Sequence, residues 1–294
     1  MPAMDYGLIL PSIGDASTRA GIEAAAAAAE RHGFGEVWGT DHLLVDASAA
    51  DDYGRTYEML TLLAWVAGRF RTVRIGTSVV VVPMRDAIVL AKELATIDEL
   101  SEGRLIVGLG AGWSTAEFKN LGLEDRFSVR GAYLEETIAL CRHLWSGSSE
   151  PFQGRFHSFN DFVFGPLPAQ GAALPIWLGG RNERALERAG RLADGYHASA
   201  SSPESFAKRV PTITAAADAA GRPMPKLSAR VRVDLDGGEQ SFYTMWGDPD
   251  RVAGEIRRFR DVGVSHLALA FPSSDPDGLT AEIDRFVGEV LPLV

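Results

Sequence analysis

The chain has 294 residues, of which 46% are apolar and 23% are charged, and this composition excludes a disordered or collagen-like protein. Acidic residues outnumber basic residues 39 to 29, and the net charge of -10 disfavours binding to nucleic acid or to anionic membranes. The single cysteine, Cys141, cannot form an internal disulfide. Neither a signal peptide nor a run of ~20 apolar residues is visible, so we expect a cytoplasmic protein.

Short apolar runs alternate with longer amphipathic patterns along the chain. The first helix is predicted to start at Ser17-Thr18 and to end at His32-Gly33, and another to extend over Asp86–Ser101 with apolar residues three and four positions apart. In chain order, the predicted strands are Asp5–Leu10, Glu36–Gly39, Arg74–Val80, Arg104–Gly110, Ile176–Gly180, Gly195–Ser199, Leu227–Val233 and His266–Phe271.

Eight strands that alternate with helices predict a (β/α)8 TIM barrel, here as a single domain over residues 1–294. A longer segment separates the fourth and fifth strands. It contains a predicted helix, Ser128–Ser146, and then an insertion at about residues 146–174. Within the insertion we expect a hairpin of Phe152–Phe156 against Asp161–Phe164, and we expect it at the end of the barrel where the site lies.

Function in such a barrel lies at the carboxyl ends of the strands. Asp41-His42 follows the second strand and is the only acid–imidazole pair at a predicted strand end. A histidine there can exchange a proton near neutral pH or orient a carbonyl group. The alternative is that His42 packs beneath the loop Leu43–Tyr53 and is satisfied by a backbone carbonyl.

Two glycine-rich segments also end strands. Gly108–Gly112 differs from a dinucleotide fingerprint because its third glycine comes one position early; these glycines either let a flat ring approach the backbone or only permit tight packing. Gly179-Gly180-Arg181 precedes a helix predicted at Arg184–Ala193. Free amides at a helix start and a guanidinium favour a phosphate group, and the alternative is a plain turn.

Several catalytic motifs are missing. None of the lysines (Lys92, Lys119, Lys208 and Lys226) lies at the end of a predicted strand, which argues against a Schiff-base aldolase. The histidines show no His-x-His or His-Glu-x-x-His spacing, and no Gly-x-Ser-x-Gly elbow is present, so we predict no metal site and no serine hydrolase. The remaining features suit a phosphorylated planar cofactor.

Several segments of the chain together resemble a known protein family. The residues that carry the resemblance are Trp38–Leu43, Arg74–Val79, Ala91–Leu105, Gly108–Trp113, Pro175–Gly180 and Ala193–His197. Together they resemble the bacterial luciferase-like monooxygenase superfamily over nearly the whole chain. The branch they resemble most is the one that uses the deazaflavin coenzyme F-420 (F420).

The resemblance implies a homodimeric oxidoreductase that passes a hydride between F420 and an unidentified small organic substrate, with His42 as the catalytic residue. It implies a bulge with a non-proline cis peptide at Ser78-Val79 that presses on the cofactor ring. Gly179, Gly180 and Arg181 would receive the cofactor phosphate. Asp98 and Arg104 would form a structural ion pair. The implied cofactor-binding residues are Asp41, His42, Thr77, Ser78, Val79, Gly110, Ala111, Gly112, Gly179, Gly180 and Arg181.

The chain departs from this branch at one position. Relatives that oxidise sugar phosphates carry a glutamate proton donor where this sequence has Trp113, so activity on glucose 6-phosphate is not expected. Glu58 is a spare candidate for a general acid, or else a residue that caps a helix.

Two alternatives remain open: an FMN-dependent monooxygenase fed by a reductase, and a flavin-binding homologue without activity. Specificity is expected in the loops Leu43–Tyr57 and Ser148–Leu174 and near Phe271–Asp275.

Overall fold

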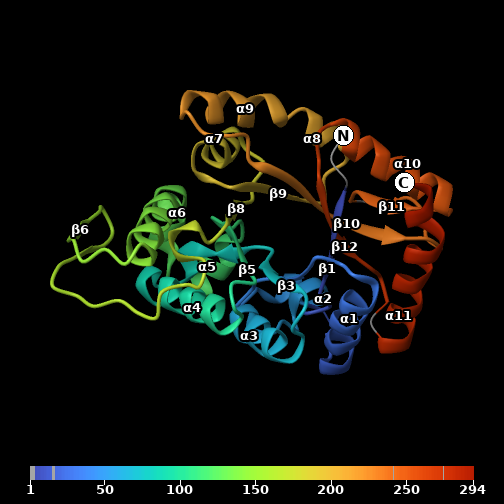
Figure 1. Cartoon of the computed structure of the whole chain (residues 1–294), viewed down its shortest axis with the longest axis horizontal. Coiled ribbons are helices and arrows are strands. Elements are labelled where there is room, and N and C mark those ends of the chain that lie inside the picture. The colour runs from blue at the N-terminus through green and yellow to red at the C-terminus, as the bar shows by residue number, and fades with distance from the viewer. Residues whose placement is uncertain (1–3, 15–16, 241, 274) are drawn as a thin grey trace.

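The computed structural model describes residues 4–14, 17–240, 242–273 and 275–294. Eight parallel strands close into a barrel, since each strand pairs with the next and β12 pairs with β1 (Figure 1). These strands are β1 (Asp5–Ile9), β2 (Glu36–Gly39), β3 (Arg74–Thr77), β5 (Leu105–Gly110), β8 (Ile176–Leu178), β9 (Gly195–Ser199), β10 (Lys226–Asp234) and β12 (His266–Ala270). The predicted TIM barrel is confirmed. That the chain is one domain stays a prediction.

Helices surround the strands and begin where the sequence offers caps. Thr18 caps α1 by accepting a hydrogen bond from the Gly21 amide, and Gly33 ends α1 with a left-handed φ of 71°. Asp86, the first residue of the helix predicted over Asp86–Ser101, caps α4 by accepting hydrogen bonds from the Ile88 and Val89 amides. The helices are α1 (Arg19–His32), α2 (Ala50–Tyr53), α3 (Met59–Arg69), α4 (Ala87–Leu100), α5 (Thr115–Asn120), α6 (Glu124–Trp145), α7 (Glu183–Leu192), α8 (Pro203–Ala207), α9 (Val210–Ala219), α10 (Pro249–Asp261) and α11 (Pro276–Arg285). In the described part of the chain, none of them is both long and apolar enough to cross a bilayer.

The third predicted strand is interrupted by a bulge. β3 ends at Thr77, and after Ser78 and Val79 a short strand β4 (Val80–Val81) pairs with β5. The Ser78-Val79 peptide is cis, as predicted. A Cβ on Gly110 would lie 2.7 Å from Val79 Cγ2, and one on Gly108 would lie 3.2 Å from Val79 Cγ1. The glycines of β5 therefore make room for the bulge, which supports the tight-packing alternative.

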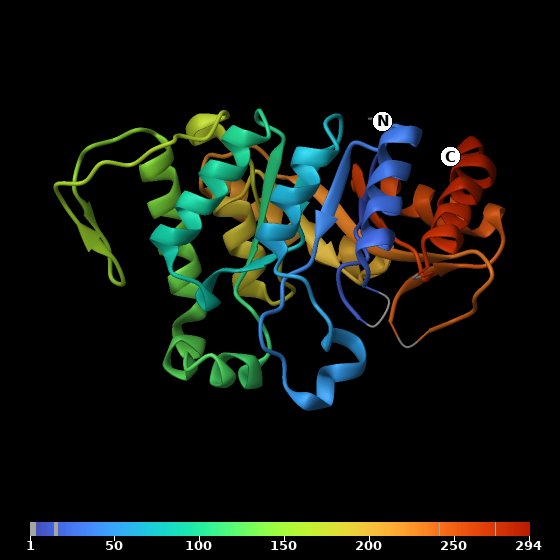
Figure 2. The same ribbon diagram turned by 90° about the horizontal axis from the view of Figure 1, so that it is seen from below.

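The insertion after α6 is not where we expected it. α6 runs antiparallel to the strands, so a segment that follows its last residue starts at the amino ends of the strands. Figures 1 and 2 show this segment projecting to the left, while the loop after β2 and helix α5 lie at the lower edge of Figure 2, at the carboxyl ends. The expectation that residues 146–174 lie at the site end is wrong. The contribution of Ser148–Leu174 to specificity stays a prediction.

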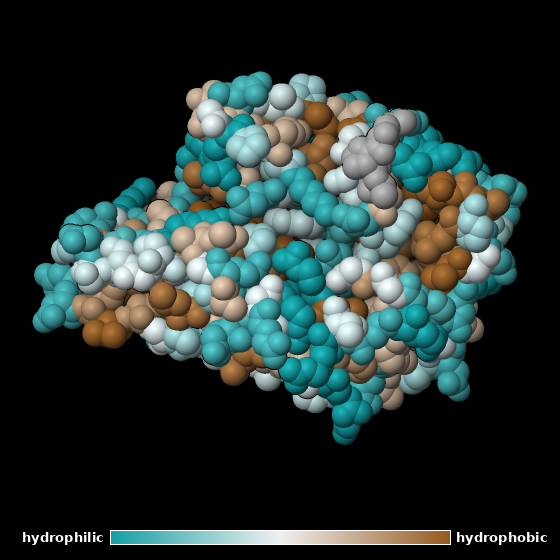
Figure 3. All heavy atoms as spheres, in the orientation of Figure 1, coloured by the Kyte–Doolittle hydropathy of each residue, from teal (hydrophilic) through white to brown (hydrophobic). Residues whose placement is uncertain are grey.

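The hairpin in the insertion is also shorter than predicted. β6 (Phe152–Gln153) pairs with β7 (Ser158–Phe159), not with residues 161–164. The rings of Phe152 and Phe159 stack at 5.4 Å, and Phe162 packs edge-on against Phe159 at 4.8 Å. Val163 is 99% exposed, and hydrophobic atoms are visible on the projection at the left of Figure 3. An additional short strand, β11 (Thr244–Trp246), extends the sheet beside β10.

The expected ion pair between Asp98 and Arg104 does not form. Asp98 instead accepts hydrogen bonds from the backbone amides of Leu105 (3.3 Å) and Gln170 (2.9 Å). Arg104 donates at 2.8 Å to three backbone oxygens at and after the end of α3, those of Ala67, Phe70 and Val73. The last carbonyls of a helix have no partner within it, so Arg104 satisfies the end of α3 and is not free for Asp98.

Candidate active site

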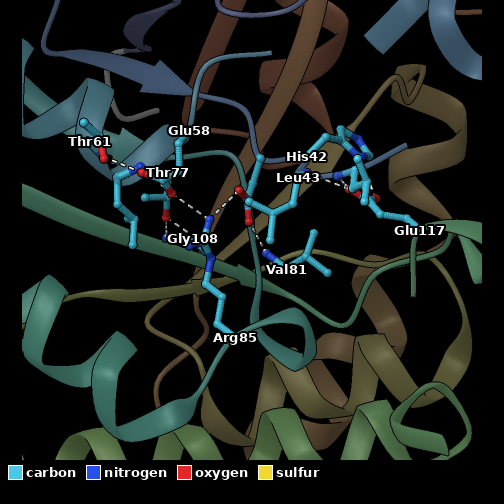
Figure 4. A network of polar contacts seen from close by, with 12 residues as sticks. His42, Leu43, Glu58, Thr61, Thr77, Val81, Arg85, Gly108 and Glu117 are labelled. Atoms are coloured by element: carbon cyan, nitrogen blue, oxygen red, sulfur yellow. Dashed lines mark hydrogen bonds and ion pairs between the residues drawn. The ribbon is translucent and has the colours of Figure 1, made fainter. Parts of the chain in front are cut away.

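The loop after β2 and helix α5 bring His42 against Glu117. His42 Nδ1 lies 2.9 Å from Glu117 Oε2, and both side chains are buried (Figure 4). The other carboxylate oxygen accepts hydrogen bonds from the amides of Leu43 (2.6 Å) and Leu44 (3.2 Å). Burial acts to raise the pKa of Glu117, but these hydrogen bonds more than offset it, so the pKa lies below its ordinary value.

An ionised Glu117 fixes the role of each His42 nitrogen. The carboxylate accepts the Nδ1 proton, which leaves Nε2 to accept or return a proton. The partner of His42 is therefore a carboxylate and not the backbone carbonyl of the alternative interpretation. Glu117 could not be recognised as a site residue from the sequence, because Ser114-x-x-Glu117 has the pattern of a helix capping box. Ser114 Oγ does accept a hydrogen bond from the Glu117 amide at 3.1 Å, but the Glu117 carboxylate points to the loop after β2.

Aromatic side chains cover His42. The ring of Tyr53 lies 4.3 Å from the imidazole, and the Trp113 indole lies edge-on at 6.1 Å. Trp113 is 63% exposed, which is unusual for so large an apolar side chain. A cavity of about 200 Å³ opens beside His42 and Tyr53, bounded by the loop that ends at Thr56. The site therefore has a proton-exchanging group next to apolar walls.

The Asp41 carboxylate stabilises the bulge after β3 through hydrogen bonds and does not line the cavity beside His42. Its carboxylate accepts hydrogen bonds from the Val81 amide (2.9 Å) and from Arg85 (2.7 Å). Arg85 also donates to Glu58 at 2.8 Å, as Figure 4 shows. Glu58 caps α3 through the Leu60 and Thr61 amides, so the capping interpretation of Glu58 is confirmed.

The bulge itself contacts two groups that the sequence did not single out. Ser78 Oγ lies 2.9 Å from His197 Nε2, and Arg230 donates to the Ser78 backbone oxygen at 3.0 Å. Burial lowers the pKa of Arg230 to about 10, and within the described residues no carboxylate pairs with it. Thr77 is committed to the sheet, because its hydroxyl donates to and accepts from Gly108 at 2.7 Å.

At the ends of β8 and β9 the structure modifies the predicted phosphate cradle. The Gly179 amide donates to Leu109 O at 3.0 Å, so it belongs to the sheet and is not available for an anion. Arg181 is exposed and donates to Ser199 O at 2.8 Å. Arg209, which the sequence did not suggest, donates to Ser201 Oγ at 2.7 Å. Two guanidinium groups thus flank this strand end.

The structure gathers most of the predicted site residues at the carboxyl end of the barrel. His42, Ser78, Val79 and the segment Gly110–Gly112 lie at the ends of three neighbouring strands. The contacts of these residues with a cofactor stay predictions. Among the described residues, no group of three or more His, Cys, Asp or Glu side chains is placed to hold a metal ion.

Comparisons with known proteins agree with this fold. A family model described as "Luciferase-like monooxygenase" matches residues 7–235. An F420-dependent glucose-6-phosphate dehydrogenase of Microbacterium testaceum is 32% identical over 279 residues, which cover 88% of this chain and 81% of that protein.

Two solved structures share the fold over most of their length. An F420-dependent secondary alcohol dehydrogenase in complex with an F420-acetone adduct has a TM-score of 0.83 at 21% identity and covers 99% of both chains. The oxygenating constituent of 3,6-diketocamphane monooxygenase of Pseudomonas putida, in complex with FMN, has a TM-score of 0.81 at 16% identity and covers 99% of this chain and 98% of that one. The barrel, the bulge and the family match over most of the chain lead to one conclusion: this protein belongs to the luciferase-like monooxygenase family.

Proposed function

We propose that this protein is an F420-dependent oxidoreductase that transfers a hydride between the cofactor and a small organic substrate. The observation that carries the proposal is the buried His42–Glu117 pair beneath Tyr53 and Trp113. The relative from Microbacterium testaceum supports F420 as the cofactor. When bound, F420 supplies a ring carbon that accepts or donates a hydride.

The residues at the carboxyl end fit such a cofactor. The exposed Trp113 indole offers a flat apolar surface for a planar ring. The hydroxyls of Ser12 and Thr40, at the ends of β1 and β2, are buried without a hydrogen-bond partner in the described part of the chain. Those hydroxyls and the Arg230 guanidinium would bind polar atoms of the ring, and Arg181 and Arg209 would bind the phosphate.

His42 would handle the proton that accompanies the hydride. With Nδ1 held by Glu117, Nε2 accepts the proton of a substrate hydroxyl during oxidation and returns it during reduction. Trp113 stands where sugar-phosphate-oxidising relatives have a glutamate, so we do not expect glucose 6-phosphate as the substrate. Homodimerisation stays a prediction that light scattering would test.

A second candidate is an FMN-dependent monooxygenase, which the FMN-bound neighbour from Pseudomonas putida favours. Titration of the purified protein with F420 and with FMN, followed by fluorescence, separates the two. We expect F420 to bind at least about tenfold more tightly, a difference of roughly 1.4 kcal/mol. Tighter binding of FMN would overturn the choice of cofactor.

The inactive-homologue alternative needs a kinetic test. F420 reduction is measured with a panel of small alcohols, in wild-type protein and in His42→Ala. We expect hydride transfer in the wild type and a loss of roughly a hundredfold or more in the variant, because general acid–base groups contribute that much. No reduction with any alcohol, together with normal F420 binding, would favour the inactive homologue.

A further inference from the structure

A continuous column of buried polar side chains runs through the barrel interior, beside the buried rings of Trp38 and Trp177. Ser78 Oγ lies 2.9 Å from His197 Nε2, and His197 Nδ1 lies 2.8 Å from Ser228 Oγ. Ser228 Oγ lies 2.7 Å from His266 Nδ1, and His266 Nε2 lies 3.1 Å from Glu36 Oε2. All five side chains are buried, and each is bonded to the next.

The column has a definite direction when Glu36 is ionised. The carboxylate only accepts, so His266 donates through Nε2 and its Nδ1 accepts the Ser228 proton. Ser228 Oγ then accepts the Nδ1 proton of His197, whose Nε2 accepts the proton of Ser78. Burial, helped by the nearby His266 and Arg230, holds the pKa of His197 well below its usual range, so His197 is neutral as this arrangement requires.

The two ends of the column reach opposite ends of the barrel. Ser78 belongs to the bulge at the carboxyl end and lies beside Arg230. Glu36 lines a cavity of about 420 Å³ at the amino end. Asp5, Arg74 and Lys226, which start three other strands, line the same cavity. The column therefore connects the candidate active site with the far surface.

A role in packing alone does not account for these side chains. TIM-barrel interiors are usually filled by branched aliphatic residues, and buried polar groups cost free energy unless every one is bonded. Here Trp38 stacks on His197 at 5.0 Å and contacts His266 at 5.5 Å, which keeps both imidazoles in place. The three inner members, His197, Ser228 and His266, each have one donor and one acceptor bond along the column, which is the arrangement that passes a proton.

We propose that Ser78, His197, Ser228, His266 and Glu36 form a proton path from the bulge to the amino-end cavity. The role in turnover rests on the proposed oxidoreductase function. A proton released at the bulge binds Ser78 Oγ as the Ser78 proton moves to His197 Nε2. The His197 Nδ1 proton moves to Ser228, the Ser228 proton to His266 Nδ1, and the His266 Nε2 proton to Glu36. One proton enters, one reaches the carboxylate, and substrate reduction uses the reverse sequence.

The first test uses the cofactor-free protein, labelled with ¹⁵N-histidine and studied by NMR. We expect His197 to carry its proton on Nδ1 and His266 on Nε2, and both protons to exchange with water at least tenfold more slowly in Glu36→Gln. The amide preserves the hydrogen bond but cannot relay a proton. The opposite tautomers, or exchange rates that do not respond to Glu36→Gln, would overturn the path.

The second test follows proton release with a pH indicator during one turnover of the F420-loaded enzyme. Ser228→Ala and His266→Gln should each slow proton release at least tenfold and leave the F420 affinity unchanged. Glutamine at position 266 can form both hydrogen bonds of the histidine but cannot relay a proton, so a slow His266→Gln variant separates proton transfer from structure. Ser101→Ala, an equally buried serine outside the column, should release at the wild-type rate. Wild-type rates in both column variants would overturn the path. Failure to bind F420 would refute only the proposed function, since the NMR test does not use the cofactor.

Discussion

The proton chemistry at His42 depends on a carboxylate that lies 75 positions away in the sequence. Glu117 orients the imidazole with one oxygen and holds the loop amides of Leu43 and Leu44 with the other. The same side chain thus sets which nitrogen faces the ligand and where the covering loop begins.

Replacing Glu117 by glutamine tests this double role. We expect Glu117→Gln to lower the hydride-transfer rate by roughly tenfold to a hundredfold, because a neutral amide stabilises the imidazolium less than a carboxylate does. Stopped-flow kinetics with F420 measures the rate. Glu135→Gln, which removes a carboxylate paired with Arg188 and Arg191 on the outer surface, is the control. An unchanged rate in Glu117→Gln would mean that the carboxylate does not assist His42.

Arg181 and Arg209 supply local positive charge in a protein whose net charge is -10. We expect Arg181→Ala to weaken F420 binding about tenfold or more, and to reduce the salt dependence of the affinity, because a charge-assisted bond to phosphate is lost. Titration at two ionic strengths measures both effects. Arg191→Ala removes the same charge at the opposite end of α7 and should leave binding intact. Equal affinities of Arg181→Ala and wild type would refute the role of Arg181.

At the scale of elements, the bulge after β3 and the glycines of β5 form one packing unit. Gly110→Ala should lower the free energy of unfolding by about 1–3 kcal/mol, because the new methyl group meets Val79 at 2.7 Å. Adding Val79→Ala should recover part of the loss, and denaturant unfolding of the double-mutant cycle measures the coupling. Gly68→Ala in α3, where the methyl group meets nothing within 4 Å, is the control. Additive effects would show that Gly110 and Val79 do not share this space.

Element positions could be predicted well where local patterns decide them. Thr18, Gly33 and Asp86 mark helix ends because their caps involve neighbouring residues only. The predicted hairpin pairing is wrong because the register depends on a short turn. Both Phe152–Phe156 and residues 161–164 are rich in aromatic side chains, so the sequence pattern does not show where the second strand lies.

The candidate site was predictable only in part, for a related reason. His42 and Ser78 stand at strand ends and could be found from the sequence. Glu117 on α5 contacts the loop after β2, and His197 and Arg230 reach the bulge from β9 and β10. No spacing along the chain reveals contacts between such distant segments.

Across the whole molecule, several carboxylates are ionised more easily in the folded state than in a free side chain. Burial, the largest influence on each, acts to raise the pKa values of Glu58, Glu117, Glu135 and Glu136, but hydrogen bonds and neighbouring basic groups bring them below the ordinary 4.5. The folded state then binds fewer protons than the unfolded state as pH falls past that value. The contribution of these carboxylates to the free energy of unfolding is therefore fully present above pH 4.5 and is lost as the pH falls below it.

We accordingly expect the urea midpoint to fall on acidification, first below the ordinary histidine pKa of 6.5, where the unfolded chain protonates His197 and the folded chain does not, and further below pH 4.5, where these carboxylates add to the decline. The Glu117→Gln variant should show a shallower decline, since one of these carboxylates is absent. A midpoint that rises on acidification would contradict the assignment.

The projecting insertion makes one peptide segment unusually accessible to proteases. Val163 is 99% exposed and lies outside the barrel, so a protease can bind the chain there without opening any strand pair. Brief digestion should yield two fragments that separate under denaturing conditions but elute together under native ones. Because the cut lies away from the carboxyl ends of the strands, the nicked protein should bind F420 as the intact chain does, and mass spectrometry of the fragments would locate the cleavage.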